Sequence, residues 1–592
     1  MTVRLFTNRP SPQPVGTPIG LAAHVKNAAK GMLVFRYSVS ADGGPIHIIR
    51  DFSQQRDFVW IPALYEHDSM VRVTVRNNET KEAADDEQPF RATSRIKDSL
   101  AVITPTANPL IALFSAPPCA DGGKFRVAFQ RQGSNALTYT PFQACSSSRS
   151  NNVYVAGMCA DSDYHLRAEF ASGSRLILGS WMTFHSGVLD GDFPPVSIAV
   201  PRDTGSRNLE PVLILSVASA GGLKRPIATD MDGNVIWYLS SPQFLTRVLL
   251  GGRLLVLSEG ANSGNDMRRL QVVREMDLAG NILRETNITR VAEQLESRGI
   301  HSDCKKSAKE CASGFHHEAI RLPNGHTLVI AGLERMFPAG TQGSKEPVDV
   351  LGDLVIDLDE DFQVSSVWNS FDHVDLNRAS LENSKCKEGP GSGGCPPIFL
   401  AGQANGWLHS NSLNYIPATG DFLISMPEQD WILKVDWRDG KGSGKVLWRL
   451  GEGGDFAAKA SDPNPWFSFQ HDAGFEPVGS NLISVLDDGH ARKKEDPAAN
   501  NRGQVWKLDE AAHTATLQHN ADLGVYSVAV GSAQSLKNGG YTFEAGFIDP
   551  ASPYSRAVET SADGKVIYAQ QVEGLIVYRS FRVADLYSAP VK

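Results

Sequence analysis

A short strand–turn–strand pattern recurs between residues 227 and 570, and it constrains the fold of this chain more than any other feature. Each copy has an apolar run, a turn rich in Asp, Asn or Gly, and a second apolar run. The six copies are residues 227–239, 272–286, 354–368, 432–450, 505–519 and 558–570. Short apolar-alternating runs separated by such turns are typical of antiparallel β-hairpins.

A second set of hairpins lies between these copies. Four of them are clear, at residues 316–332, 408–425, 470–486 and 531–545. Two hairpins per unit make a four-stranded sheet, and six such sheets predict a six-bladed β-propeller over residues 188–592. The alternative is two further β-sandwiches, but sandwiches would not require the same internal repeat six times.

The residues before the repeats predict two small β-sandwich domains, the first Ig-like over residues 1–95 and the second fibronectin-III-like over residues 96–187. Both contain apolar runs such as "GMLVFRYSVS" and "KFRVAFQRQG". We expect the charged stretch "NETKEAADDEQP" to be a loop near the boundary. Helical periodicity is nearly absent apart from residues 287–299, so the expected fold class is all-β.

Length and charge limit the possible functions. The chain has 592 residues, enough for several domains. Its formal net charge of -9 gives no basic footprint for nucleic acid. No run of about eighteen apolar residues occurs, so no membrane-spanning helix is expected. The N-terminal "MTVRLFTNRPSPQPVG" lacks the apolar stretch of a signal peptide, which leaves open a cytoplasmic location or the removal of an earlier signal.

The seven cysteines suggest an oxidising compartment. Cys304 and Cys311 flank one short polar loop, and Cys386 and Cys395 flank another. Such loops indicate surface disulfide clips and therefore a periplasmic or secreted protein, although reduced and unrelated thiols are the alternative. Neither loop has the close CxxC spacing of a zinc site. At least one cysteine of the remaining set is unpaired within the chain; that set is Cys119, Cys145 and Cys159.

Polar residues recur at one place in the second hairpins. When these hairpins are aligned on their turns, comparable positions hold His316-His317-Glu318, His409 with Asn411, Gln470-His471-Asp472, and Ser532 with Gln534. A lone histidine in a strand is usually structural. Histidines at equivalent positions of different blades instead indicate a shared cavity at the propeller axis.

Converging histidines have three main uses: binding a metal, acting as acid, base or nucleophile, and holding an anion. Asn411 lies two residues after His409 and so points to the same side of a strand. An amide donor beside an imidazole suits the oxygens of a tetrahedral anion better than it suits a soft metal. We therefore expect no metal site and no cofactor.

These motifs resemble a known family. The segments "HHEAIRLPNGHTLVIAG", "WLHSNSLNYI", "VLWRLGEGGDF", "FSFQHDAGF", "GSAQSLKNG" and "VYRSFRVADLY" together resemble the arylsulfate sulfotransferases that work without phosphoadenosine-phosphosulfate, over roughly residues 220–590. The resemblance implies a six-bladed propeller with its active site in the central channel, often with a small N-terminal β-domain. It also implies a periplasmic, disulfide-containing enzyme that moves a sulfuryl group between phenols by a ping-pong route through a sulfohistidine.

The resemblance assigns roles to individual residues. His471 of "QHDA" matches the family nucleophile, and His409 and Asn411 of "HSN" would bind sulfate oxygens or move protons. "HHE" supplies a further histidine, with His317 favoured over His316. The implied partners are a phenolic sulfate donor and a phenol acceptor, and a homodimer is an open possibility for the assembly. Asp472 and Glu318 are expected to form structural hydrogen bonds behind the blade.

One departure from the family pattern is serious. After "HSNSLNYI" the family places an Arg that clamps the sulfate, whereas this chain has "ISMPEQD" with Pro427 at or near that position. Proline has no N–H donor. Arg492 is the first choice for a replacement, followed by Arg335 and Arg579. Without a replacement, the fold would suit a metal-dependent enzyme that uses the channel histidines, or a propeller that only binds a partner.

Overall fold

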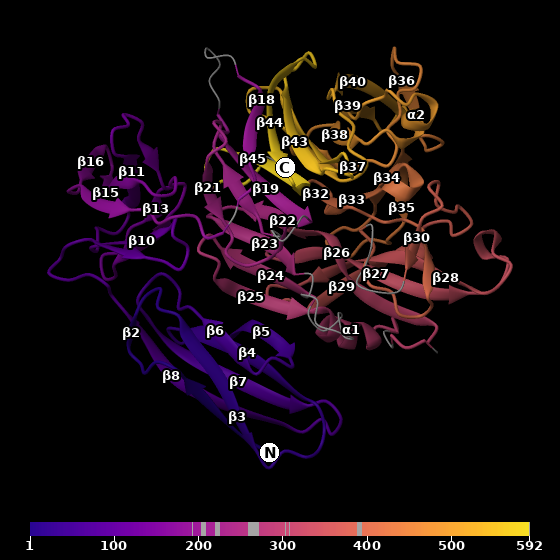
Figure 1. Ribbon diagram of the computed structural model, residues 1–592. Coiled ribbons are helices and arrows are strands. Elements are labelled where there is room, and N and C mark those ends of the chain that lie inside the picture. Colours follow the sequence, from indigo (N-terminus) through magenta and orange to yellow (C-terminus); the bar gives the residue numbers. More distant parts are fainter. Residues whose placement is uncertain are drawn as a thin grey trace.

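The computed structural model places strands along almost the whole chain (Figure 1). It describes residues 1–191, 193–202, 209–219, 225–258, 271–301, 304–306, 308–387 and 394–590. Within these ranges the α-helices are α1 (Ile288–Glu296) and α2 (His490–Glu495), and three short 3-10 turns accompany them. The predicted all-β class and the predicted helix near residues 287–299 are confirmed. No helix in the described ranges is long and apolar enough to cross a membrane.

The N-terminal strands form two facing layers. One layer contains β1 (Thr2–Thr7), β3 (Ile19–Lys26) and β6 (Asp57–Trp60). The other contains β2 (Gln13–Pro14), β8 (Ala83–Thr93), β7 (His67–Asn77), β4 (Leu33–Ala41) and β5 (His47–Ser53). Alternate residues of these strands, including Leu21, Tyr37, Trp60 and Val73, fill a common core. This is the pattern of strands with one buried face.

The expected loop at residues 78–89 is wrong, because most of it belongs to β8. Its residues alternate between exposed and half-buried side chains. On the inner face, Asp86 accepts a hydrogen bond from the Leu5 backbone N–H at 2.7 Å, and Gln88 donates to the Leu5 carbonyl at 2.7 Å. Polar residues therefore fit this strand, because they bond the backbone of β1 instead of entering the core.

The next part of the chain also forms two sheets. The first contains β9 (Val102–Pro105), β10 (Ala112–Ala116) and β14 (Asn151–Val155). The second contains β11 (Lys124–Arg131), β12 (Thr138–Tyr139), β13 (Gln143–Ala144), β15 (Asp163–Ser172), β16 (Arg175–Leu178) and β17 (Met182–His185). Buried side chains from both sheets, among them Phe114, Phe125 and Leu166, pack together.

Six antiparallel sheets follow, and all six predicted hairpins occur in them. The first three are β19 (Val212–Ser219), β20 (Ile227–Thr229) and β21 (Val235–Tyr238) with β45 (Ile576–Val583); β22 (Phe244–Leu249), β23 (Arg253–Ser258), β24 (Val272–Asp277) and β25 (Ile282–Asn287); and β26 (Glu310–Arg321), β27 (Thr327–Phe337), β28 (Val348–Leu358) and β29 (Val364–Asn369) with β30 (Lys385–Lys387) and β31 (Gln403–Gly406).

The last three sheets complete the series. They are β32 (Ser412–Ile416), β33 (Asp421–Met426), β34 (Trp431–Val435) and β35 (Val446–Leu450); β37 (His471–Phe475), β38 (Leu482–Asp487), β39 (Arg502–Asp509) and β40 (Thr514–Asp522) with β36 (Ala457–Lys459); and β41 (Gly531–Ser535), β42 (Tyr541–Ile548), β43 (Tyr554–Thr560) and β44 (Val566–Glu573) with β18 (Val196–Val200). The predicted second hairpins are β26–β27, β32–β33, β37–β38 and β41–β42.

The first strands of these sheets contact one another in series. β22 contacts β26, β26 contacts β32, β32 contacts β37, and β37 contacts β41. β41 contacts β45, which pairs with β19, and β19 in turn contacts β22. The last strand of the chain therefore completes the sheet that β19 begins. Strands far apart in sequence meet around a common centre.

The N-terminal sheet joins this assembly through β5. A parallel bridge pairs Arg50 of β5 with Glu285 of β25, so the two sheets are continuous. The side chains of the same two residues form a buried ion pair. Figure 1 shows the indigo N-terminal strands beside β25 and α1.

Three disulfides stabilise loops in the described part of the chain. The two predicted clips, Cys304–Cys311 and Cys386–Cys395, are confirmed. The third disulfide joins Cys119 to Cys145, and Cys159 is free, as expected for an odd number of cysteines.

We predict that β45 is essential for stability because it completes a sheet and its Phe581 is buried in a large core. Phe581→Ala should lower the free energy of unfolding by about 3–5 kcal/mol, the usual cost of removing a buried aromatic ring. Urea unfolding measures this change. Leu250→Ala is the control, because Leu250 is 75% exposed and its loss should change stability by less than about 0.5 kcal/mol. Equal effects of the two substitutions would contradict the role of β45.

Candidate active site

Three polar residues near the centre of the six sheets adopt left-handed backbone conformations. The φ angles are 56° at His317, 55° at His409 and 53° at Asp472. The strand registers of β26 and β37 shift next to the first and the last of these residues. A non-glycine residue with positive φ costs of order 1 kcal/mol or more, and such residues cluster at functional sites. The bulges turn these side chains away from regular strand alternation.

His316 and His317 form a hydrogen-bonded pair that an aspartate orients. Nε2 of His316 lies 3.1 Å from Oδ1 of Asp353, and Nδ1 of His316 lies 2.7 Å from Nδ1 of His317. Burial opposes ionisation of Asp353, but hydrogen bonds from His316 and from the Ser410 N–H hold its pKa below the usual value. When His316 is neutral beside an ionised Asp353, it donates through Nε2 and accepts through Nδ1. His317 must then donate through Nδ1, which leaves a lone pair on its Nε2.

His409 lies against His317, with ring centroids 4.8 Å apart. Gly394, which lies within the loop closed by the Cys386–Cys395 disulfide, is next to both rings. A Cβ atom on Gly394 would be 2.9 Å from Nε2 of His409 and 3.3 Å from Nε2 of His317. Burial and the neighbouring His316 lower the pKa of His409 to about 4. Both Nε2 atoms therefore face one small space in the neutral state.

His471 is held by a second aspartate. Its Nδ1 lies 2.5 Å from Oδ2 of Asp488, and both side chains are buried. Burial lowers the pKa of His471 to about 3, and the positive charge of Arg579 acts in the same direction. Burial raises the pKa of Asp488 well above its usual range. The close contact fixes the orientation of the imidazole through its Nδ1 atom.

Tyr578 of β45 lies between the two histidine groups. Its ring centroid is 5.6 Å from that of His317 and 6.3 Å from that of His471. Its hydroxyl donates to the Asn411 carbonyl at 2.8 Å, and burial raises its pKa above the usual value. The tyrosine therefore stays protonated. The structure thus brings His317 and His471 into contact with one aromatic ring, with His316 and His409 packed against His317.

A buried charge network lies behind these rings. Arg579 donates to Glu318 at 2.8 Å and lies 3.4 Å from Asp472, while Arg247 of β22 pairs with the same two carboxylates at 2.6 and 3.6 Å. Glu318 and Asp472 thus have the structural role expected of them, and their arginine partners come from two other sheets. Two cations and two anions balance, which buried charges require.

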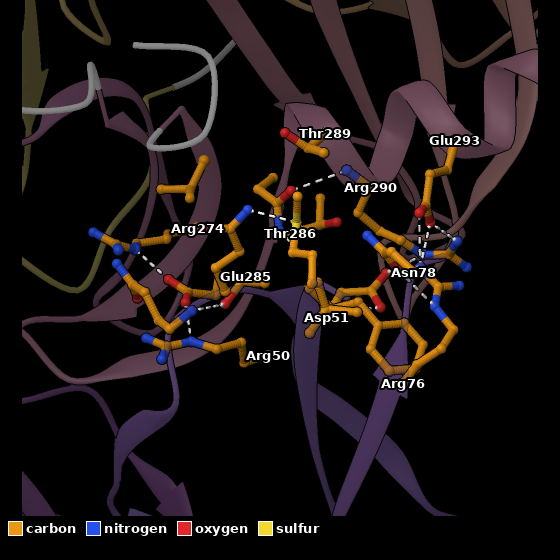
Figure 2. A pocket seen from close by; sticks show the side chains of 18 residues that line it. Arg50, Asp51, Arg76, Asn78, Arg274, Glu285, Thr286, Thr289, Arg290 and Glu293 are labelled. Atoms are coloured by element: carbon orange, nitrogen blue, oxygen red, sulfur yellow. Dashed lines mark hydrogen bonds and ion pairs between the residues drawn. The ribbon is translucent and has the colours of Figure 1, made fainter. Parts of the chain in front are cut away.

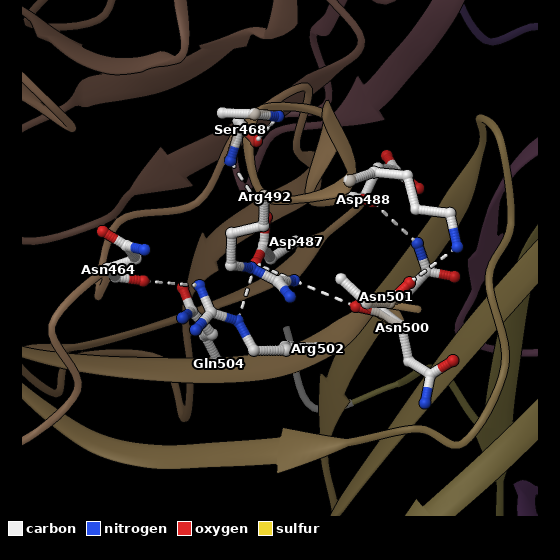
Figure 3. A network of polar contacts seen from close by, with 12 residues as sticks. Asn464, Ser468, Asp487, Asp488, Arg492, Asn500, Asn501, Arg502 and Gln504 are labelled. Atoms are coloured by element: carbon white, nitrogen blue, oxygen red, sulfur yellow. Dashed lines mark hydrogen bonds and ion pairs between the residues drawn. The ribbon is translucent and has the colours of Figure 1, made fainter. Parts of the chain in front are cut away.

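Arg492, the first choice for a sulfate clamp, is engaged elsewhere. Its guanidinium pairs with Asp487 at 2.9 Å and donates to the Asn500 carbonyl at 3.0 Å. Arg502 binds the same Asp487 side chain. Figure 3 shows this network, which the labelled neighbours Asp488 and Asn501 extend. Arg492 therefore contacts Asp487, the residue next to Asp488, and among the described residues it forms no hydrogen bond or ion pair with a histidine of the cluster.

The other proposed ligands of a sulfate are also engaged. Arg335 pairs with Glu310 at 2.5 Å. The Asn411 amide donates to the Gln470 carbonyl at 2.8 Å. Ser532 and Gln534 bond to the backbone of β45, and not to the histidines.

The position that the family resemblance reserves for an arginine has a structural role here. Glu428, which follows Pro427, is buried and accepts hydrogen bonds from the hydroxyls of Ser380 and Ser384, the latter at 2.6 Å. Its carbonyl also accepts the Leu381 N–H at 2.9 Å. The carboxylate therefore anchors the segment that leads into the Cys386–Cys395 loop beside the histidines. Within the described ranges, no group of three or more His, Cys, Asp or Glu side chains is arranged to hold a metal ion.

Several functional residues were not anticipated from the sequence. Asp353 and Asp488 orient histidines, Tyr578 separates them, and Gly394 covers them. Asp488 directly follows β38, the strand that pairs with the His471 strand β37. A carboxylate at that position of the hairpin could have been predicted from the sequence to lie near His471. Asp353 and Tyr578 come from other parts of the chain, and no local pattern marks them.

Comparison with known proteins decides the family. The family model described as arylsulfotransferase (ASST) matches residues 200–579, which is well over half of the chain. The chain belongs to the arylsulfotransferase family. The matched region contains every histidine of the cluster and ends at Arg579. Among curated proteins, none matches this chain.

One solved structure is a weak neighbour of this arylsulfotransferase-family chain. A two-domain fibronectin type III segment from chicken tenascin matches with 11% identity, covering 31% of this chain and 96% of the tenascin segment. Its TM-score is 0.14, which is too low to support a conclusion about the fold.

We predict that His409 makes stability depend on pH. Its pKa is about 4 in the folded protein and about 6.5 in an unfolded chain, so the unfolded chain binds the extra proton between these values. Stability should therefore fall as the pH is lowered through this window, by roughly 2 kcal/mol from this residue at pH 5 relative to pH 7.

Urea unfolding of wild type and His409→Asn at both pH values measures this contribution. Asparagine tolerates the left-handed backbone of this position. The loss of stability between pH 7 and pH 5 should be about 2 kcal/mol smaller in the variant. His24→Asn, at an exposed position, is the control. It should lose as much stability between pH 7 and pH 5 as wild type does. An unchanged loss in His409→Asn would show that this imidazole is not kept neutral by burial.

Proposed function

We propose that the protein is an arylsulfotransferase-like enzyme that moves a sulfuryl group from a phenolic sulfate ester to a phenol. The observation that carries this proposal is His471, held through Nδ1 by Asp488 and grouped with two further neutral imidazoles inside the family region. A neutral histidine with one fixed nitrogen can present the other nitrogen as a nucleophile. Small phenolic substrates follow from the family.

In the first step, the lone pair on Nε2 of His471 forms a bond to sulfur, and the bond from sulfur to the aryl oxygen breaks. The phenolate leaves with that electron pair. The sulfated imidazole gains positive charge, and its Nδ1–H donates to the Asp488 carboxyl. Sulfuryl transfer resembles phosphoryl transfer, in which positioning and electrostatics supply most of the catalysis.

In the second step, the acceptor phenol attacks the same sulfur and the bond between sulfur and His471 breaks. The phenol has an ordinary pKa of about 10 and needs a base. Nε2 of His317 suits this role, because the chain from Asp353 through His316 leaves its lone pair free. His409 lies beside it and is the second candidate. The released lone pair returns to His471, the base passes the phenol proton to solvent, and the enzyme is restored.

Electrostatics supports an anion in this space. The charge of Arg579 lowers the pKa of both His317 and His471. The same field that disfavours a cation on these imidazoles favours a sulfate group next to them. Arg579 is bonded to Glu318 and to backbone carbonyls, so it would act through its field more than through direct contact.

The architecture that fits this function is a six-bladed propeller over residues 188–592, preceded by sandwich domains over residues 1–95 and 96–187. The serial contacts of the innermost strands and the return of β45 to β19 support this arrangement. The three disulfides support a location in the periplasm or outside the cell, because such bonds persist in oxidising compartments.

We predict that His471→Ala abolishes transfer from 4-nitrophenyl sulfate to a phenol. Wild type should release more than one equivalent of nitrophenol per enzyme only when an acceptor is present. Incubation with the donor alone should add one SO₃ group to the peptide that contains His471, as read by mass spectrometry. The exposed His301→Ala is the control and should keep wild-type activity. Transfer that survives in His471→Ala would remove this residue as the nucleophile.

We predict that Asp488→Asn lowers kcat by about 10²-fold or more while KM changes little, because the carboxyl orients the nucleophile and stabilises charge formed during reaction. Steady-state kinetics with varied donor measures both constants. If Asp488→Asn raised only KM, Asp488 would instead contribute to binding of the substrate in its ground state. Far-UV circular dichroism and urea unfolding identify any variant that is inactive through misfolding.

A further inference from the structure

A cavity of about 220 Å³ lies at the junction of the N-terminal sheet with β24, β25 and α1 (Figure 2). Strands β4, β5 and β7 supply one wall, and residues 272–293 supply the other. None of the histidines of the candidate active site lines it. Two segments distant in sequence therefore enclose a separate space.

The cavity wall carries a positive charge. Four arginines and three carboxylates line it, which gives a formal balance of +1 (four minus three); they are Arg50, Arg76, Arg274, Arg290, Asp51, Glu285 and Glu293. Figure 2 shows one cluster around Glu285 and a second around Glu293 on opposite sides. The excess positive charge lies on the side of Glu285, where Arg50 and Arg274 pair with a single carboxylate, so an acidic ligand would meet favourable charge there.

The carboxylates use their acceptor capacity within the wall. Glu285 accepts from both Arg50 and Arg274. Glu293 accepts from Arg76 at 2.7 Å and from Arg290 at 2.8 Å. Asp51 also accepts several hydrogen bonds, including one from Arg36 at 2.8 Å. Little acceptor capacity is left for a ligand that donates.

The arginines have donors in surplus. Each guanidinium carries five N–H donors. Arg50 uses one toward Glu285 and one toward the Asp57 carbonyl at 2.7 Å. Arg274 uses one toward Glu285 and makes a long contact of 3.5 Å with Gln243. The charged groups of the wall therefore offer more free hydrogen-bond donors than acceptors. This suits an anion, which is rich in acceptor oxygens.

A buried hydroxyl supports the same conclusion independently. Thr286 lines the cavity and is 1% exposed. Its Oγ1 has no hydrogen-bond partner among the described residues. A buried hydroxyl without a partner costs about 1–3 kcal/mol. A ligand oxygen in the cavity would remove that cost.

Part of the wall is apolar. Met32, Val34 and Val272 line the cavity with the ring of Phe52. The guanidinium groups of Arg36 and Arg76 lie 4.1 and 4.4 Å from the Phe52 ring centroid. A ligand with a small apolar body beside its acidic group would cover these surfaces.

We propose that this cavity binds a small organic anion, with a sulfonate, sulfate or carboxylate group facing the arginine N–H groups and Thr286, and a short apolar body against the Met32 and Val34 side. The site is separate from the proposed catalytic histidines. Because its walls come from the N-terminal sheet and from β25 and α1, an occupied cavity stabilises the junction between them.

Isothermal titration calorimetry on the full chain tests this site with two probes. Benzenesulfonate combines the anionic group with an apolar ring, and inorganic sulfate supplies the anionic group alone. We expect benzenesulfonate to bind wild type at least tenfold more tightly than inorganic sulfate and to raise the thermal unfolding temperature. Equal affinities would overturn the apolar part of the proposal, and the absence of binding by both probes would overturn the whole.

Two variants locate the binding. Thr286→Val removes the hydroxyl and keeps the shape, so it should weaken benzenesulfonate by about 5–20-fold. Thr289→Trp places a large ring at an exposed position of the lining and should abolish binding without disturbing the core. The matched control Gln132→Trp, also at an exposed position, should bind as wild type does.

A third variant separates this site from the active site. His471→Ala should bind benzenesulfonate with wild-type affinity. Wild-type binding by Thr289→Trp, together with lost binding in His471→Ala, would assign the probe to the histidine cluster and overturn the proposal. Failure of the sulfuryl-transfer assay would leave these binding measurements unaffected, so the two proposals are tested separately.

Discussion

The candidate site depends on one buried charge network. Glu318 and Asp472 directly follow His317 and His471, and Arg579 directly follows Tyr578. Arg247 completes the network from β22. Each of the four charged residues thus comes from a different sheet. Removing one partner of such a group would leave a buried charge uncompensated, which commonly costs about 3–5 kcal/mol. The network therefore fixes the relative positions of the rings next to it.

This arrangement explains how strained residues persist at the centre. His317 and Asp472 have positive φ angles, which the free chain would rarely adopt. The ion pairs of Glu318 and Asp472 hold the adjacent backbone in place. The strain has a geometric result: two imidazoles leave the ordinary alternation of their strands and approach Tyr578.

Burial then sets the chemistry of the histidines. Desolvation lowers the pKa of His409 to about 4 and that of His471 to about 3. Neutral imidazoles keep a lone pair for nucleophilic attack or for accepting a proton. Asp353 and Asp488 decide which nitrogen of a ring is held. In the proposed mechanism, the same residue type therefore serves as orienting group, base and nucleophile according to its contacts.

Local patterns predicted the hairpins well, because turn residues and apolar alternation act over a few neighbouring positions. The charged stretch at residues 78–89 was misread as a loop, because its polar side chains bond to Leu5, a residue more than eighty positions away. Arg492 illustrates a second difficulty. The sequence contains both Arg492 and Asp487, but it does not show that the two side chains form an ion pair, which engages the arginine that was predicted to bind sulfate.

The sequence by itself determined the all-β class, the six hairpins, two of the disulfides and the family, because each depends on short-range order or on motifs read in sequence. It also singled out the histidines that meet at the centre. The tertiary structure decided which carboxylates orient them, that Arg579 is balanced by two acids, and that a cationic cavity lies between β5 and α1. These features depend on long-range contacts, whose energies are set by burial and by the positions of charges from different sheets.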